Sequence, residues 1–511
     1  MMKRTGITAS FDHSGFELLP REVKRFFTEN AGQSLLVTGA PGTGKTLFTL
    51  RVLDSLARGP DEALYVSSRI DEDAIQRLYL GGYPSLDRTN VLDLSRDPFD
   101  TPMDVEFPFD DLSTDTFLDW VRSVNDVSHG LVLAFDSWEL IQESLSRSPR
   151  EQVEDEVLVE RLATLARREE IDLLLVVEDT AESSLEYITD GVARLHVDEN
   201  DTGQTIRTLR LEKLRGVHIG NRSKPFSLVD GRYRSFSPIQ ISAIRAATGT
   251  EQWEPTSGTK STFATGIDTL DTLLSDGYNR GSVVHAELGP DLPRDAWTLV
   301  TLPTIRNFLA QERGVAVVPP RETSPGLLQG DLSAAVSPEV FERFCAVFVP
   351  PTGINDTTED GTSESEWLVS RGEPDGQTDE TRTASGKGLR DGIHNRGLDY
   401  AAYLAEVERI RPPDDGPVLH AFSTEAMDER IESQLDDFAQ YVTVHNDLAL
   451  IVTKPGSELR SRTDRVADVH LQLEREEETI LLSGQNPFTP LLGVGIDTER
   501  CIPRIVLLEM V

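Results

Sequence analysis

The segment from Gly39 to Thr46 constrains this chain more than any other part of its sequence. It matches the phosphate-loop pattern G-x-x-x-x-G-K-[ST] at every position. Its residues are Gly39, Ala40, Pro41, Gly42, Thr43, Gly44, Lys45 and Thr46. An apolar run at 34–38 predicts a buried strand before the loop, and 47–53 predict a helix after it. This frame of strand, loop and helix is the setting in which the pattern binds phosphate.

The residue types of the loop indicate how it would hold a nucleotide. Its glycines let backbone N–H groups curve around phosphate oxygens, and the N-terminus of the following helix adds partial positive charge. Lys45 is expected to reach the β- and γ-phosphates, and Thr46 to ligate Mg²⁺. We therefore expect ATP and Mg²⁺ as cofactors.

A second metal ligand is predicted at Asp136. An apolar run at 131–135 precedes this carboxylate, which is the Walker B pattern. The carboxyl ends of parallel strands face the crevice where ligands bind. The alternative is that Asp136 only caps the helix that begins near Trp138. Its place at the end of a strand downstream of the loop favours the metal site.

The composition is strongly acidic. The 511 residues include 87 Asp and Glu against 50 Lys and Arg, only eight of them lysine, and the net charge is −37. The excess of acidic residues is spread along the chain, as in proteins from salt-rich cytoplasms. Because high salt screens charge, the acidic surface argues only weakly against nucleic-acid binding.

No apolar run reaches the roughly 18 residues of a membrane span, and the first residues lack the apolar stretch of a signal peptide. Cys345 and Cys501 lack disulfide or metal-ligand spacing. We expect a cytoplasmic protein with no membrane partner.

The order of apolar segments predicts two α/β domains. Strand candidates alternate with helix candidates, which indicates a mainly parallel sheet, and 203–236 alternate like antiparallel strands. We assign 1–244 to the first domain, 245–262 to a linker and 263–511 to the second domain. A stretch at 353–395 rich in Thr, Glu, Asp, Gly and Ser is predicted to be a disordered acidic insertion.

Residues 31–236 resemble the RecA superfamily, and in particular its KaiC-like archaeal branch. The resemblance rests on the predicted strand order, on the two motifs above and on Lys213-Leu214-Arg215-Gly216. It implies a RecA-like P-loop NTPase core.

At the end of the second strand, this chain differs from the KaiC-like branch that it resembles. A pair of glutamates usually ends the second strand in this branch, where this chain has Ser67 and Ser68. Serine is a poor base, and loss of a general base slows turnover about 10²–10⁴-fold. Glu72, Glu139 and Glu178 are possible substitutes. We expect ATP binding with slow or absent hydrolysis.

A catalytic role in trans is implied for Lys213 and Arg215. In KaiC-like rings the corresponding segment reaches the γ-phosphate of the neighbouring subunit, so the chain would form homo-oligomers on ATP. His218 lies one position before the family's usual histidine. The alternative is that Lys213 and Arg215 are exposed strand cations.

The second half resembles a degenerate copy of the same domain. Residues 265–271 resemble the segment before the phosphate loop of KaiC-like domains, and a strand at 282–286 follows. The loop itself, Gly289 to Ala296, has Asp295 where the lysine belongs. Since an aspartate repels phosphate, we expect a RecA/KaiC-like fold that has lost its nucleotide. An unrelated α/β domain is the alternative.

One intact site followed by one degenerate site resembles the GvpD family of haloarchaeal gas-vesicle regulators. Similar details are Ser-Ser-Arg after the second strand, Asp-Ser-Trp at 136–138 and a basic cluster. The cluster consists of Arg207, Arg210, Lys213, Arg215, Arg222, Lys224, Arg232 and Arg234. The resemblance implies an ATP-dependent switch that acts on a protein partner such as a transcription activator. Salt pairing within the sheet explains the basic cluster equally well.

The competing hypothesis is a RecA-type DNA-acting ATPase of recombination or repair. Such a protein needs basic or aromatic loops after the Walker B strand. Residues 143–156 are mostly acidic or polar there, with Arg147 and Arg150 as the basic exceptions. We therefore expect no nucleic-acid partner. A relative of the GvpD family in another signalling pathway is a third possibility.

Overall fold

The computed structural model describes most of the chain and divides it into two compact units. The described residues are 16–94, 113–146, 155–178, 184–245, 252–349, 368–370, 382–383, 400–426 and 434–510, apart from 58, 60, 61, 129, 201, 202, 322 and 334. Unit 1 comprises Phe16–Ser237 and the last residues from Glu509, and unit 2 comprises Pro238–Leu508. The division thus falls after Ser237, whereas the sequence suggested residue 244. Most of the predicted insertion at 353–395 lies outside the described residues.

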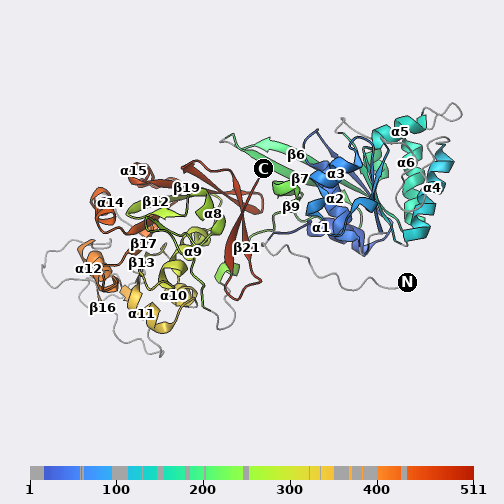
Figure 1. Cartoon of the computed structure of the whole chain (residues 1–511). Coiled ribbons are helices and arrows are strands. Elements are labelled where there is room, and N and C mark those ends of the chain that lie inside the picture. The colour runs from blue at the N-terminus through green and yellow to red at the C-terminus, as the bar shows by residue number, and fades with distance from the viewer. Residues whose placement is uncertain are drawn as a thin grey trace, which may run out of the picture. The chain divides into compact units, whose positions relative to one another are not determined.

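Unit 1 is built on a nine-stranded sheet (Figure 1) with the order β3-β2-β4-β5-β1-β6-β7-β8-β9. The strands from β3 to β6 in this order pair in parallel, and those from β6 to β9 pair antiparallel. The predicted α/β class with a mainly parallel sheet is confirmed. The strands are β1 (Ser34–Gly39), β2 (Ala63–Ser67), β3 (Val91–Asp93), β4 (Val132–Asp136), β5 (Asp172–Val176), β6 (Gly191–Glu199), β7 (Thr205–Leu214), β8 (Ser223–Ser227) and β9 (Arg234–Ser235).

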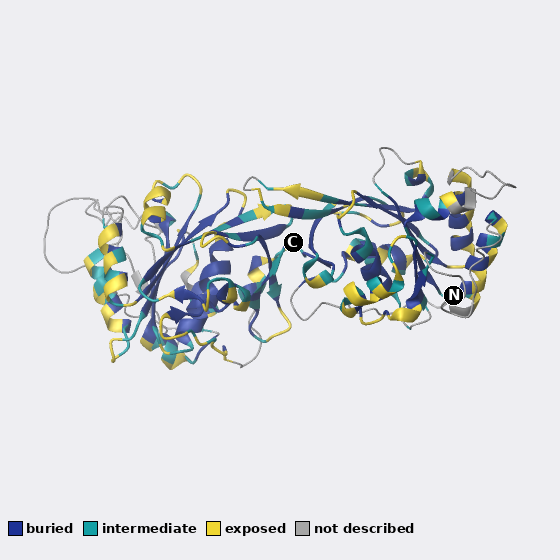
Figure 2. Ribbon diagram, turned by 45° about the horizontal axis from the view of Figure 1, so that its top comes forward, coloured by how far each residue is buried: buried dark blue, intermediate teal, exposed yellow. Residues whose placement is uncertain are grey.

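Helices cover both faces of this sheet. Leu35 and Val37 of β1 belong to one apolar cluster with Phe48 of α2, whereas Leu36 belongs to another with Phe117 of α4. Alternate residues of one strand therefore fill two cores, and full burial of such side chains contributes about 1.5–3 kcal/mol each. The helices are α1 (Arg21–Glu29), α2 (Lys45–Leu56), α3 (Glu72–Leu78), α4 (Thr114–Ser128), α5 (Trp138–Ser146), α6 (Asp155–Arg168) and α7 (Leu185–Ile188). Figure 2 shows the buried strands in dark blue and the exposed outer sides of helices in yellow.

Unit 2 contains an eleven-stranded sheet with the order β16-β15-β14-β13-β17-β18-β12-β19-β20-β21-β22, and β10 and β11 form a separate pair. The strands are β10 (Thr262–Phe263), β11 (Tyr278–Asn279), β12 (Ser282–Leu288), β13 (Gly314–Val318), β14 (Cys345–Val349), β15 (Leu368–Ser370), β16 (Arg382–Thr383), β17 (Val418–Ser423), β18 (Leu448–Thr453), β19 (Val469–Glu476), β20 (Thr479–Asn486), β21 (Leu492–Asp497) and β22 (Arg504–Glu509). The helices are α8 (Asp268–Leu273), α9 (Thr298–Leu309), α10 (Pro325–Ser333), α11 (Pro338–Phe344), α12 (Tyr400–Ile410), α14 (Leu435–Val444) and α15 (Arg460–Val466).

The sheet of unit 2 repeats the topology of unit 1. From β14 to β22 its order matches that of unit 1 strand by strand, so β12 corresponds to β1, β17 to β4 and β19 to β6. α9 follows β12 as α2 follows β1. The second half therefore has an α/β fold with the same strand order as the P-loop unit. In the predicted linker, Trp253 is buried in the core of unit 2, so part of this segment packs as a piece of that unit.

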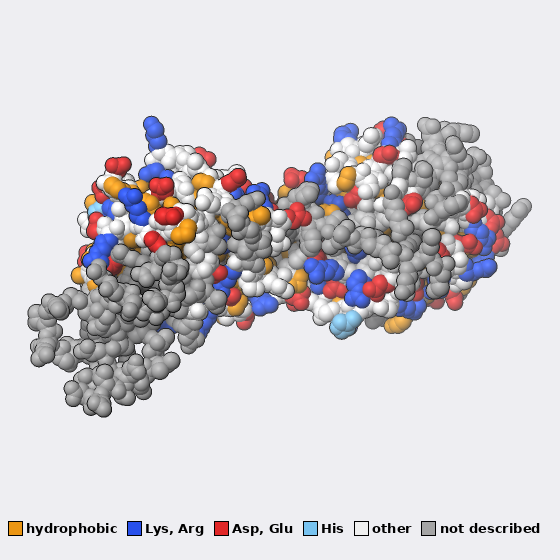
Figure 3. All heavy atoms as spheres, turned by 90° about the horizontal axis from the view of Figure 1, so that it is seen from below, with side chains coloured by type: hydrophobic (Ala, Val, Ile, Leu, Met, Phe, Trp, Pro, Cys, Tyr) orange, Lys and Arg blue, Asp and Glu red, His pale blue; other side chains and the backbone are white. Residues whose placement is uncertain are grey.

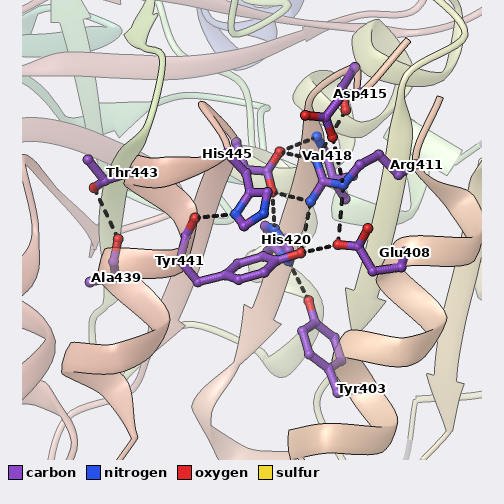
Figure 4. Close-up of polar contacts among 12 residues, drawn as sticks. Tyr403, Glu408, Arg411, Asp415, Val418, His420, Ala439, Tyr441, Thr443 and His445 are labelled. Carbon is purple, nitrogen blue, oxygen red and sulfur yellow. Dashed lines mark hydrogen bonds and ion pairs between the residues drawn. The ribbon is translucent and has the colours of Figure 1, made fainter. Parts of the chain in front are cut away.

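A buried polar network ties α12 to the sheet of unit 2 (Figure 4). Arg411 donates two hydrogen bonds of 2.9 Å to the carboxylate of Asp447, which also accepts one from the backbone of Val418 at 2.7 Å. One ring nitrogen of His420 lies 3.2 Å from this carboxylate, and the other lies 2.6 Å from the hydroxyl of Tyr403. Buried charge is tolerated here because every charged group has partners.

The charged surface mixes both signs. On the face in Figure 3, Lys and Arg side chains lie interspersed with Asp and Glu on each unit. Among the described residues, no helix combines the length and the apolar character needed to cross a bilayer.

Candidate nucleotide site of unit 1

The loop between β1 and α2 has the backbone shape that its glycines allow. Gly39, Gly42 and Gly44 have φ values of 153°, 80° and 101°, and Gly44 caps the N-terminus of α2 in the left-handed region. A Cβ atom on Gly39 would lie 2.5 Å from the carbonyl oxygen of Leu195, and one on Gly44 would lie 2.6 Å from a methyl carbon of Leu228. Side chains at these two positions are therefore excluded by both conformation and space.

Lys45 begins α2 and folds back over the loop. Its Nζ donates to the carbonyl oxygens of Gly39 at 2.5 Å and of Ala40 at 3.1 Å. Partial burial lowers the pKa of Lys45, against the opposing charges of Asp136 and Glu178. A half-buried ammonium that is held over the N-terminus of a helix suits the recognition of a phosphate group.

Thr46 and Asp136 meet at the carboxyl ends of β1 and β4. The hydroxyl of Thr46 donates to Asp136 Oδ2 at 2.7 Å, and the hydroxyl of Tyr65 donates to the same oxygen at 2.5 Å. Burial, followed by the charge of Asp136, raises the pKa of Tyr65 well above its ordinary value, so the phenol keeps its proton. The hydroxyl and the carboxylate are hard oxygen donors of the kind that Mg²⁺ prefers, and they fit a shared metal. Sequence reasoning missed Tyr65, because a tyrosine in a buried strand gives no motif.

The end of β2 holds hydroxyl groups rather than a carboxylate. Ser68 Oγ accepts from the backbone of Ser137 at 2.9 Å, and Ser67 donates to the carbonyl of Ile70 at 2.6 Å. Both serines therefore connect loops at the carboxyl edge of the sheet.

The possible substitute bases are engaged in other contacts. Glu178 forms an ion pair with Arg69, which lowers the pKa of this carboxyl, and the backbone of Glu178 donates to Glu139. Glu72 pairs with Arg88. Glu139 and Glu178 nevertheless lie close enough to Lys45 for their charges to act on its ammonium. A carboxylate with a lowered pKa is a weaker base.

Lys213 and Arg215 lie at the opposite end of the sheet from the loop. Leu214 between them pairs with Gly191, which in turn pairs with Leu35 near the start of β1. Lys213 donates to the carbonyl of Glu186 at 2.7 Å, and Arg215 forms a 2.8 Å ion pair with Asp190. They are not part of the nucleotide site of their own chain.

The other end of β7 does reach the phosphate loop. Arg207 donates to the carbonyl of Gly42 at 3.0 Å. Sequence reasoning placed Arg207 in the basic cluster without a link to the loop, because the contact joins residues that are far apart in the chain. Other members of the cluster pair within the unit: Arg210 and Arg222 with Glu212, and Lys224 with Glu22.

The corresponding place in unit 2 lacks these groups. Its loop leads into a 3₁₀ turn, Arg294–Trp297, which contains Asp295 and precedes α9. Ala296 and Trp297 are buried in the apolar core. The strand that corresponds to β4 ends in Ser423 instead of an aspartate.

Two family models match this chain, one in each of its two halves. The model of the family "GvpD gas vesicle protein, P-loop domain" matches residues 23–212, and that of "GvpD basic region 2" matches residues 252–511. Two curated relatives come from Halobacterium salinarum. Protein GvpD1 is 47% identical over 526 residues, covering 98% of both chains, and Protein GvpD2 is 47% identical over 511 residues, covering 100% of both. The chain is a nucleotide-binding P-loop protein that belongs to the GvpD family.

Proposed function

We propose that this chain is an ATP- and Mg²⁺-dependent switch in gas-vesicle regulation that turns over ATP slowly or not at all. The observation that carries the proposal is the contrast between the two units. Unit 1 brings Lys45, Thr46 and Asp136 together around one site, whereas unit 2 keeps the fold and has Asp295 and Ser423 at the corresponding places. A single phosphate-binding site in a two-unit chain suits a sensor of nucleotide.

Slow hydrolysis is supported by the groups around the γ-phosphate position. Ser67 and Ser68 replace the carboxylates expected of a general base, and the ion pair with Arg69 lowers the pKa of Glu178. Loss of a general base reduces turnover about 10²–10⁴-fold. A rate below about 1 s⁻¹ would lie under the usual range of enzymes.

Assembly on ATP is supported by the position of Lys213 and Arg215. Because they lie at the end of the sheet away from their own loop, a γ-phosphate that they contact would have to belong to a neighbouring subunit. The link to gas vesicles is supported by the name of the matching family. The protein partner, a transcription activator, is supported by the family resemblance alone. We place the switch in the cytoplasm, with no nucleic-acid partner.

The test compares the purified wild-type chain with Lys45→Ala, and uses Lys260→Ala, an exposed lysine of unit 2, as the control. ATP binding is measured by equilibrium dialysis, turnover by phosphate release, and the partner by pull-down of the gas-vesicle transcription activator with and without ATP. We expect Lys45→Ala alone to bind ATP roughly ten- to hundredfold more weakly and to reduce ATP-dependent capture accordingly. Turnover well above 1 s⁻¹ would overturn the binding switch. ATP-dependent, salt-sensitive binding to DNA would favour the DNA-acting class instead.

A further inference from the structure

Unit 2 contains a second polar cluster, formed by His285, His470 and Asp464 and called the histidine cluster below. His285 of β12 and His470 of β19 are direct register partners in neighbouring parallel strands. Their rings stack with centroids 4.6 Å apart and an interplanar angle of 11°. Asp464 comes from α15, and its Oδ1 lies 2.6 Å from His285 Nδ1 and 3.6 Å from His470 Nδ1. Three separate elements thus converge on one point.

The cluster replaces apolar side chains of unit 1. When the two sheets are matched from their first paired residues, Leu36 and Val192 stand where unit 2 has His285 and His470. Leu36 and Val192 are buried in an apolar core, and His285 is also completely buried. A buried imidazole costs free energy unless its nitrogens have partners, and Asp464 and Thr453 are the partners of His285.

The Nε2 atom of each histidine faces a side-chain oxygen from an adjacent strand. His285 Nε2 lies 2.6 Å from the hydroxyl of Thr453, and His470 Nε2 lies 3.6 Å from Glu287 Oε2. Both Nδ1 atoms meanwhile face Asp464. His285 has the pattern of metal-binding histidines, in which one nitrogen faces the metal position and the other is held by an oxygen that orients the ring.

The charge of the cluster also favours a cation. The cluster has two carboxylates, Asp464 and Glu287, and the guanidinium of Arg460 lies 2.8 Å from Glu287 Oε2. Glu287 is 4% exposed, and within the described part of the chain Glu287 Oε2 and His470 Nε2 form no hydrogen bond of good geometry. A divalent cation at the cluster would offset the carboxylate charge that Arg460 does not balance.

We propose that His285, His470 and Asp464 bind a divalent transition metal of the Zn²⁺ class. One ligand atom from each residue lies within 4.8 Å of the others. Two imidazole nitrogens and one carboxylate oxygen form a donor set that Zn²⁺ accepts, with a fourth position left for water or another ligand. Binding would widen the contact between His285 and Asp464 and draw His470 inward, because Zn–N and Zn–O bonds are about 2.0–2.2 Å long. The side chain of Asp464 is 36% exposed, which gives the metal a route in.

The experiment titrates the full chain, freed of metal with a chelator, with Zn²⁺ against a chromophoric chelator. We expect one equivalent per chain, and at least a tenfold loss of affinity in Asp464→Asn, a partly exposed position at which folding is preserved. Asp415→Asn, an exposed carboxylate of the same unit, and His445→Gln serve as controls and should bind like the wild type.

Two further measurements separate metal binding from a structural role. Thr453→Val removes only the oxygen behind His285 and should weaken Zn²⁺ binding about tenfold. Co²⁺ bound to the wild type should give the intense visible absorption of a four-coordinate site, and His470→Ala should lose this absorption. Absence of stoichiometric Zn²⁺ binding by the wild type, or equal affinity in Asp464→Asn, would overturn the proposal.

Discussion

The two units have one topology and two different sites. In unit 1 the strand β1 leads into a glycine-shaped loop with Lys45 at the start of α2. In unit 2 the equivalent strand β12 leads into a 3₁₀ turn with Asp295, and the helix α9 that follows is buried along its whole length. The difference shows that the fold depends on the apolar pattern of strands and helices, whereas phosphate binding depends on a few positions in one loop.

The same comparison extends to the other face of the sheet. Unit 1 places Leu36 and Val192 in an apolar core at the register where unit 2 places two histidines. Unit 2 thus lacks the lysine and threonine of the phosphate loop and has buried polar groups beneath α15. If each unit has its own chemistry, changes in one should leave the site of the other intact.

The largest effect is expected for Asp447→Ala in unit 2. This change leaves Arg411 buried without its carboxylate and should destabilise unit 2 by about 3–5 kcal/mol. Hydrogen–deuterium exchange read peptide by peptide would show faster exchange in β17 and β18, with unit 1 unchanged. The conservative control is Glu408→Gln, whose carboxylate is largely exposed. Equal loss of protection in β1 and β4 would contradict the independence of the units.

The network also predicts how the stability of unit 2 depends on pH. Burial by itself would raise the pKa of Asp447, but hydrogen bonds from His420 and Arg411 outweigh burial and lower this pKa below its ordinary value. The stabilisation that the Asp447 carboxylate contributes is therefore complete above about pH 4, the pKa of an unfolded aspartate, and is lost as the pH falls through the lower folded pKa of this group. In acid unfolding, wild type and Asp447→Ala should converge. A stability gap that stays constant below pH 3 would exclude this linkage.

Next in size is the effect of Lys45→Ala on nucleotide binding. Loss of hydrogen bonds from a charged donor costs about 1.5–3 kcal/mol, which corresponds to a roughly ten- to hundredfold weaker affinity. The matched change in unit 2, Asp295→Lys, should add no second site, because Ala296 and Trp297 are buried where the loop would have to open. Isothermal titration with ATP measures both the affinity of Lys45→Ala and the number of binding sites in Asp295→Lys. A second binding event in Asp295→Lys would show that the loop of unit 2 lost only its charge.

Many features of the two units were predictable from the sequence, because the motifs that indicate them are local. The phosphate loop and the strand before Asp136 depend on residues that are neighbours in the chain. The α/β class and the family were predictable for the same reason. Contacts of Tyr65 and Arg207 were not, since they join distant segments through the sheet register. The histidine cluster was also invisible, because His285 and His470 meet only when β12 and β19 pair.

A smaller effect is expected when a glycine of the loop before the helix is replaced in each unit. Gly44→Ala forces a side chain into a left-handed conformation, which costs about 1–2 kcal/mol, and moves its Cβ into Leu228. Gly289→Ala meets a carbonyl oxygen at 3.1 Å without a left-handed backbone, so unit 2 should lose less stability. Thermal unfolding of the two variants tests this order. Equal losses would mean that the loop of unit 2 is as constrained as the phosphate loop.

The smallest effect is expected for Arg207→Ala, which breaks the link between β7 and the phosphate loop. A single hydrogen bond at a partly exposed site contributes about 0.5–1.5 kcal/mol, so ATP affinity should fall about two- to tenfold. The matched control is Arg210→Ala, which lies on the same strand, pairs with Glu212 and should leave affinity unchanged. If both variants bind ATP like the wild type, the contact with Gly42 does not stabilise the binding conformation of the loop. If both weaken binding equally, the basic strand acts through its overall charge, and that shared effect should disappear as salt is raised, whereas the loss from a specific contact should persist.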